Sequence, residues 1–261
     1  MRREVEGLCD TCRMSFRQPL LLLFLSFCSS FTFARQATDS STTPRILIIP
    51  YQPGMHMPDP ADLDISTYSG IQLDEMRKEF REGLLKSLRS KIVTVYDAEL
   101  LQSDHVGDDD DDNSLIYHAE YFQQDTIWPV AHPKKDSLLK MKTFVNPKSR
   151  KPFAIDKLYM NVGFYDQQLL GDFSRKYNVD LFVVLNQFEI RTNFKDCMDL
   201  ALKIYDREVR VHYAVFDRDG KQVHGDLAVS HFLSNSNDIN EIMRENYPRI
   251  TEYILTSLNN R

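Results

Sequence analysis

Cysteine is scarce in this chain of 261 residues, which has four: Cys9, Cys12, Cys28 and Cys197. Cys9 and Cys12 have C-x-x-C spacing, but no β-α-β pattern surrounds them to support a redox site. The first three cysteines fall in a segment that we expect to be removed, so the mature chain would form no intrachain disulfide. Cys197 stands beside apolar residues and is interpreted as a small core residue rather than a reactive thiol.

Basic residues are fewer than acidic ones: the chain has 32 Lys and Arg residues and 38 Asp and Glu residues, which gives a net charge of -6. Proteins that bind a nucleic-acid backbone usually carry a basic patch, so we expect no nucleic-acid partner. The sequence contains no G-x-S-x-G nucleophile elbow, no H-E-x-x-H metal pair and no phosphate-binding glycine loop. We therefore expect neither catalytic activity nor a cofactor.

The longest apolar run stands near the start of the sequence, from Pro19 to Phe33. Arg17 precedes it and Ala34 follows it, which gives the basic flank, short apolar region and small residue of a secretory signal peptide. The run is short for a membrane span. We expect residues 1–34 to be a signal peptide, with Met14 as an alternative start, followed by a polar lead over 35–44 and one domain over 45–261.

Cys28 lies inside this run, where a lipidated cysteine would become the first residue of a bacterial lipoprotein. The bulky Phe27 stands directly before it, at the position where that signal has a small residue. We therefore expect cleavage after Ala34 and export of the mature chain. Association with a membrane is expected only if Cys28 is lipidated.

Residues 178–232 predict three consecutive strands. Leu181–Leu185 is a continuous apolar block, and alternating apolar residues then flank the turn Asp217–Gly220. We expect a three-residue loop at this turn, which would pair Val215 with Val223 and make one face of the hairpin apolar. The opposite face would be free for water or a partner and would carry the candidate interaction residues Arg210, His212, His224 and Asp226.

Two short β-branched runs, Arg45–Pro50 and Ile92–Tyr96, predict parallel strands. Between them, Ser69–Gln72 has the spacing of a capping box and should begin a helix whose apolar stripe continues to Leu88. The loop before this helix, Tyr51–Tyr68, is expected to be solvated.

Two further helices are predicted. One spans Asp166–Tyr177 and is closed by Asn178; the other spans 238–258, where Asp238 should cap it and Pro248 should kink or restart it.

Residues 97–157 interrupt this pattern and are interpreted as an insertion. They include Asp108–Asp112, a run of five acids that repel one another and favour an exposed loop. Such a run could gather calcium weakly, but it lacks the glycine turn and the distal glutamate of a dedicated calcium site.

The predicted order is β-α-β, insertion, α-β-β-β-α, which indicates an α/β fold with a single mixed sheet and helices on one face. With the phrases Arg45–Pro50, Tyr177–Val184 and Asp217–Gly220, this order resembles the α/β domain shared by CsgG-like proteins and the N-terminal domain of TolB. The resemblance implies a non-enzymatic accessory protein in the periplasm or at the outer membrane of a Gram-negative bacterium, and we expect it to bind another envelope protein. The chain differs from both relatives because no propeller domain follows and no long amphipathic hairpins suited to a pore are evident.

An alternative function lies in the loop Tyr51–Tyr68, as a small periplasmic metal-binding protein or hydrolase. The candidate metal ligands are His56, Asp59, Asp62 and Asp64. The imidazole and its flanking methionines suit copper, whereas the carboxylates suit a harder ion. The spacing matches neither an EF-hand nor a zinc motif, so we expect no metal here.

The predicted signal peptide can be tested by N-terminal sequencing of the exported protein. We expect the mature chain to start near Arg35 and to fractionate with water-soluble proteins. An acylated Cys28 at the mature terminus would contradict this prediction and would place the protein on a membrane.

Overall fold

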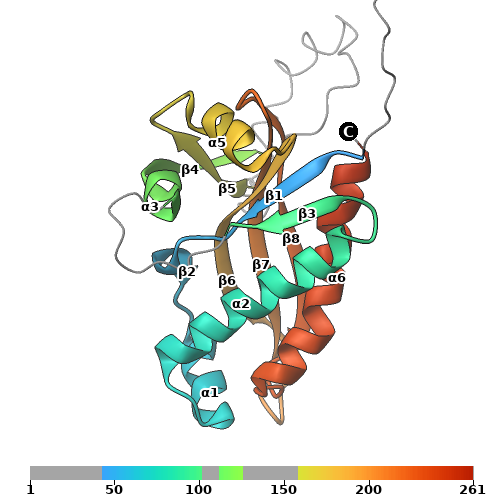
Figure 1. Ribbon diagram of the computed structural model, residues 1–261. Coiled ribbons are helices and arrows are strands. Elements are labelled where there is room, and N and C mark those ends of the chain that lie inside the picture. The colour runs from blue at the N-terminus through green and yellow to red at the C-terminus, as the bar shows by residue number, and fades with distance from the viewer. Residues whose placement is uncertain (1–42, 102–111, 126–157, 261) are drawn as a thin grey trace, which may run out of the picture. The chain divides into compact units, whose positions relative to one another are not determined.

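The computed structural model describes residues 43–101, 112–125 and 158–260, which all belong to one unit, 42–261 (Figure 1). The expected signal peptide, most of the polar lead and the acids 108–111 lie outside these residues. No helix in the described ranges has the length and apolar character needed to span a membrane.

The main sheet is mixed, with strand order β3-β1-β6-β7-β8 and with β2 also paired to β6. Strand β1 pairs in parallel with β3 and with β6, and β2 also pairs in parallel with β6. Strands β6, β7 and β8 follow one another in antiparallel hairpins. The fold is therefore α/β, as the sequence predicted. Its strands are β1 (Arg45–Ile49), β2 (His56–Met57), β3 (Asp97–Leu100), β6 (Leu181–Asp199), β7 (Ile204–Asp217) and β8 (Gln222–Leu233).

The first face of this sheet packs against α1 (Pro60–Ser69), α2 (Leu73–Ile92) and α6 (Ile239–Asn259). Helices α2 and α6 lie side by side (Figure 1). The predicted apolar stripe of α2 is fully buried here and consists of Met76, Phe80, Leu84 and Leu88. Burial of each such side chain stabilises the fold by about 1.5–3 kcal/mol.

The second face is covered in part by α3 (Asp112–Tyr117), α5 (Leu169–Tyr177) and a separate two-stranded sheet of β4 (Ala119–Asp125) and β5 (Leu158–Phe164). The predictions of a single sheet and of helices on one face were therefore wrong. The central strands carry apolar side chains on both faces, such as Leu47 and Phe182 on the second, so both faces must be covered.

Several element boundaries also differ from the prediction. The segment 51–68 is not a solvated loop, because it contains η1 (Pro53–Met55), β2 and most of α1. The predicted strand 92–96 does not form, because Ile92 is the last residue of α2 and residues 93–96 form a turn. The strand β3 begins after it, at Asp97. The predicted insertion contains β3, α3 and β4.

The predicted capping box does not form. Gln72 is the N-cap residue of α2 without a side-chain hydrogen bond. Ser69 instead ends α1, and its hydroxyl accepts a hydrogen bond from the backbone N–H of Ile239 at the start of α6. The hydroxyl therefore joins two helices rather than capping one.

The predicted closure of α5 by Asn178 and the predicted cap of α6 by Asp238 are confirmed, whereas α5 begins at Leu169 rather than at Asp166. Asn178 closes α5 in the left-handed conformation, with φ of 52°. The carboxylate of Asp238 accepts a hydrogen bond from the backbone N–H of Glu241 and caps α6. Helix α6 continues through Pro248 without restarting, and its neighbours Tyr247 and Ile250 are both buried in the core.

The predicted register of the β7–β8 hairpin was wrong. Val215 lies opposite His224, and a bulge separates this pair from the next, Phe216 and Gln222. The side chain of Asp217 accepts hydrogen bonds from two backbone N–H groups of the turn and so fixes it. Consequently the even-numbered residues of β8, rather than the odd-numbered ones, face the helices of the first face.

This register places polar residues of β8 against α6, where each finds a partner. Ser230 donates a hydrogen bond to Asn246 over 2.7 Å, and Asp226 accepts one from Tyr253 over 2.5 Å. Because these groups are satisfied, burying them carries a much smaller cost than burying unpaired polar groups.

Gly225 offers a test of how β5 packs on the sheet. It lies on the second face, where an added Cβ would overlap the hydroxyl of Tyr159, a fully buried residue of β5. We expect Gly225→Ala to lower the free energy of unfolding by about 1–3 kcal/mol, as overpacking does.

Urea denaturation measures this change. The matched control is Gly54→Ala, where an added Cβ meets nothing within 4 Å and the effect should stay within about 0.5 kcal/mol. Equal stability of the two variants would contradict the packing of Tyr159 against β8.

Candidate functional site

Part of the second sheet face lies beyond the covering helices and the β4–β5 sheet. There β6, β7 and β8 line a cavity of about 560 Å3. Strand alternation and register bring its residues together, because Glu189 pairs with Arg210 and Glu208 pairs with both Arg191 and His231. We call this surface the open face: Glu189, Arg191, Glu208, Arg210, Val229 and His231.

Arg210 is the centre of the charge network on the open face. Its buried guanidinium donates hydrogen bonds to Glu189 over 2.7 Å and to Glu208 over 2.9 Å. Two carboxylates therefore flank one buried cation, which satisfies its charge and fixes its position. The arrangement is a rigid charged surface.

His212 extends this network toward β5. Its Nδ1 accepts a hydrogen bond from the backbone N–H of Met160 over 2.8 Å, so the ring donates from Nε2 to Glu189, 3.2 Å away. Burial alone would raise the pKa of Glu189. The hydrogen bond from His212 and the charge of Arg210 outweigh burial, so the pKa of Glu189 lies below its ordinary value.

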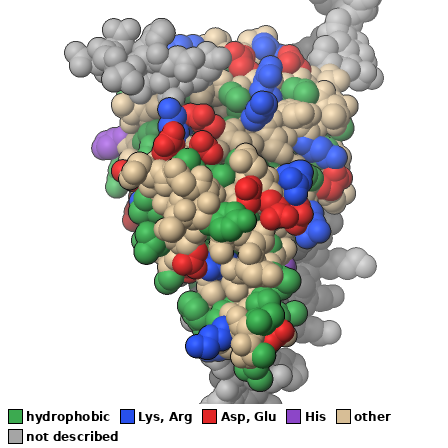
Figure 2. Space-filling model, turned by 90° about the horizontal axis from the view of Figure 1, so that it is seen from below, with side chains coloured by type: hydrophobic (Ala, Val, Ile, Leu, Met, Phe, Trp, Pro, Cys, Tyr) green, Lys and Arg blue, Asp and Glu red, His purple; other side chains and the backbone are tan. Residues whose placement is uncertain are grey.

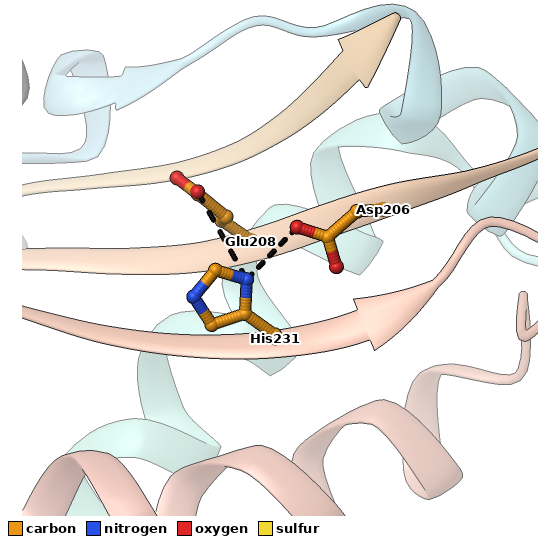
Figure 3. Close-up of side chains that lie close together, drawn as sticks. All are labelled: Asp206, Glu208 and His231. Atoms are coloured by element: carbon orange, nitrogen blue, oxygen red, sulfur yellow. Dashed lines mark hydrogen bonds and ion pairs between the residues drawn. The ribbon is translucent and has the colours of Figure 1, made fainter. Parts of the chain in front are cut away.

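At the edge of the open face, Asp206, Glu208 and His231 converge (Figure 3). Within the described ranges they are the group of His, Cys, Asp and Glu side chains whose possible ligand atoms all lie within 4.8 Å of one another. His231 Nδ1 lies 2.9 Å from Asp206 and 4.0 Å from Glu208. Asp206 is hydrogen-bonded to His231, and Glu208 forms an ion pair with Arg210, so both carboxylates have partners in the protein. In the sequence, Asp206 and Glu208 stand out only as alternating residues of one strand.

The four predicted interaction residues do not share an exposed face. Arg210 and His212 lie on the second face as predicted, but His224 and Asp226 lie on the first, beneath α6. His224 contacts the hydroxyl of Tyr213 at 3.1 Å. All four side chains are buried, so none of them forms a free binding surface.

The predicted metal ligands do not converge either. His56 and Asp62 are both buried and lie 3.4 Å apart. Asp59 caps α1 and accepts a hydrogen bond from the hydroxyl of Thr192, whereas Asp64 pairs with Arg207 at 2.6 Å. These four side chains therefore could not all coordinate a single metal ion.

Beyond the open face, β6 and β7 continue past the end of β8, whose last paired residue is Leu233. Cys197 is half-buried in this extension, so it is not a core residue, and its Sγ lies 3.3 Å from the carbonyl oxygen of Asp199 and 3.5 Å from that of Ile204. We call 194–203 the hairpin tip. Its exposed apolar side chains are Phe194 (61% exposed), Met198 (65%), Leu200 (84%) and Leu202 (70%).

Apolar and charged side chains are mixed on the surface of this part of the molecule. Figure 2 views the molecule from the end of Figure 1 at which the β6–β7 turn lies, and hydrophobic groups reach the surface there among charged ones. The tip itself carries the exposed bases Lys195 and Lys203. Phe194 and Lys195 also line the cavity, which makes the tip continuous with the open face.

Comparisons with known proteins give little further information. No protein-family model matches the chain, and no curated protein matches it. Among solved structures, a PelC variant from Paraburkholderia phytofirmans, described as a dodecamer, is similar over 84% of this chain and 91% of its own. The identity is 8% and the TM-score 0.35, a likeness too weak to support any argument.

The network around Arg210 predicts a pH dependence of stability. We expect Glu189→Gln to lower the free energy of unfolding at pH 7 by about 1–3 kcal/mol, because it weakens hydrogen bonds between charged groups. Since the pKa of Glu189 lies below 4.5 in the folded chain, its contribution is complete above pH 4.5 and is lost as the pH falls through the folded value.

The difference between wild type and Glu189→Gln should therefore shrink below pH 4.5. Urea denaturation at pH 7 and at a series of acidic pH values tests this. The control is Glu120→Gln, a change at an exposed residue of β4, which should show no such trend. A difference independent of pH would contradict the network.

Proposed function

We propose that this chain is an exported, non-catalytic accessory protein of the bacterial cell envelope, which binds another envelope protein through the hairpin tip and the open face. One observation carries the proposal: four large apolar side chains are exposed together at the tip. Exposed apolar groups that gather beside charged ones are typical of interaction sites.

The chemistry of the surface favours a particular kind of partner. Lys195 and Lys203 stand at the tip, and Arg191 lines the cavity of the open face. The tip also contains Asp199, and the open face contains Glu189 and Glu208, so charges of both signs border the apolar side chains. An apolar patch bordered by charges of both signs would complement this combination, because apolar contact supplies affinity while paired charges direct the approach. The partner is therefore inferred to be a protein with an apolar patch bordered by both acidic and basic side chains.

Two sequence features support the envelope as the location. The run Pro19–Phe33 has the pattern of a signal peptide, and the order of elements resembles the envelope domains of CsgG-like proteins and TolB. Both features are independent of the tip.

The alternative function, a metal-binding protein or hydrolase based on the segment 51–68, finds less support. Asp59 and Asp64 have structural partners at two separate places, at the N-terminus of α1 and beside Arg207. Elemental analysis of the purified protein distinguishes the two functions, because stoichiometric metal would favour the alternative.

The proposed interaction is tested with a variant of the tip that combines Phe194→Ser, Leu200→Ser and Leu202→Ser. A pull-down from envelope extract identifies candidate partners, and each is then purified and titrated against wild type and variant. We expect the Kd to rise at least about tenfold in the variant, as happens when central apolar contacts are removed. Its free energy of unfolding should change little, since these side chains are exposed.

The matched control carries three exposed apolar residues replaced elsewhere: Leu63→Ser, Tyr68→Ser and Tyr165→Ser. It should bind the partner like wild type. Equal binding by the tip variant would refute the proposal. Binding of the tip to anionic lipid vesicles, with no protein partner retained, would also refute it and would indicate a membrane surface as the target.

A further inference from the structure

A second cavity, of about 390 Å3, lies between the segment after β1 and the first half of α2. It is separate from the tip and the open face, and nothing in the proposed function uses it. Its lining combines an aromatic wall with charged residues of α2: Tyr51, Pro53, His56, Asp74, Arg77, Lys78, Arg81 and Glu82.

The inner wall of this cavity holds buried polar atoms that have no hydrogen-bond partner among the described residues. They are the hydroxyl of Tyr51, Nδ1 of His56 and Nε of Arg77, whereas Nε2 of His56 lies 3.4 Å from the carboxylate of Asp62. Such groups are costly to bury unpaired, and each is normally satisfied by protein, water or ligand. Tyr51 and His56 are more than nine-tenths buried and line the cavity itself, so a polar group in the cavity would satisfy them.

Arg81 supplies the charge. Its Nε donates to the carbonyl of Tyr51 and one Nη donates to the hydroxyl of Tyr117, both over 2.8 Å. The guanidinium also lies 6.0 Å from the centre of the Tyr51 ring. These contacts hold Arg81 in place, yet none of its partners in the described ranges is a carboxylate, so its positive charge is not neutralised by an ion pair.

The other charged residues around the cavity form ion pairs. Arg77 lies 3.5 Å from the buried Asp62 and 3.8 Å from Asp74. Asp74 and Glu82 are exposed at the rim, and Glu82 is paired with Lys78. A fixed guanidinium beside unpaired O–H and N–H donors is an arrangement suited to carboxylate or phosphate oxygens.

We propose that this cavity binds a small oxyanion, a carboxylate or a phosphate group, with Arg81 as its main charged ligand and Tyr51, His56 and Arg77 as hydrogen-bond donors. The ring of Tyr51, which stacks on the buried Phe188, forms an apolar side of the site that excludes water. Exclusion of water strengthens the charged hydrogen bonds.

Isothermal titration calorimetry and thermal unfolding of the full chain test the proposal, with inorganic phosphate and succinate as probes and sodium chloride of equal ionic strength as reference. We expect saturable binding of at least one probe and a rise in Tm. The stronger probe identifies which oxyanion the site prefers. Arg81→Gln should raise its Kd at least about tenfold, the effect of losing a hydrogen bond to a charged group.

Two further variants separate binding from folding. Arg89→Gln removes the same charge from an exposed position of α2 and should bind like wild type. Tyr51→Phe keeps the ring and removes the unpaired hydroxyl, so it should weaken binding without lowering the Tm of the free protein. Binding by Arg81→Gln equal to that of Arg89→Gln, or stabilisation no greater than sodium chloride gives, would overturn the proposal.

Discussion

The apolar block at the start of β6 is buried on both of its faces, and the layers of the domain depend on this burial. Leu181, Val183 and Leu185 point to the first face, and Phe182 and Val184 point to the second. A strand with this composition is unstable unless something packs on each side. Helices α2 and α6 cover one side; α5 and the β4–β5 sheet cover the other. Where this apolar block gives way to the charged residues of β6, the second face no longer requires an apolar cover and becomes the open face.

The same domain buries polar groups in two different ways. Between β8 and α6 they are paired, as Ser230 with Asn246 and Asp226 with Tyr253, and they contribute specificity because a one-residue slip of β8 would leave them unpaired. Beside the second cavity, the hydroxyl of Tyr51 and Nδ1 of His56 have no hydrogen-bond partner within the described residues. Paired groups of this kind serve the fold, whereas unpaired groups beside a cavity are typical of a ligand site.

The sequence predicted those parts of the fold that depend on local pattern. The spacing of Met76, Phe80 and Leu84 indicated α2, and Asp238 indicated the start of α6. The register of β8 depends instead on a bulge beside Phe216 that the side chain of Asp217 stabilises, and apolar alternation contains no signal for it. The strand Leu158–Phe164 alternates weakly, because Asn161 and Gly163 meet specific neighbours rather than bulk core.

In the candidate site too, the sequence predicted the positions that depend on local pattern and missed those that depend on register. Strand alternation placed Arg210 and His212 on the second face correctly, because the parity within one strand requires no knowledge of its partner. His224 and Asp226 were misplaced because their side depends on the register across the turn. The cavity beside Tyr51 brings together η1, β2 and α2, and its buried polar atoms become apparent only once these elements have packed.

The pairing of β4 with β5 has a consequence for how this chain can vary. Asp125 lies directly opposite Leu158, so the residues on either side of the segment 126–157 are fixed next to each other. The entropy of closing a loop rises only slowly with its length. A change in the length of the connection between Asp125 and Leu158 would therefore add little to the entropic cost of pairing β4 with β5.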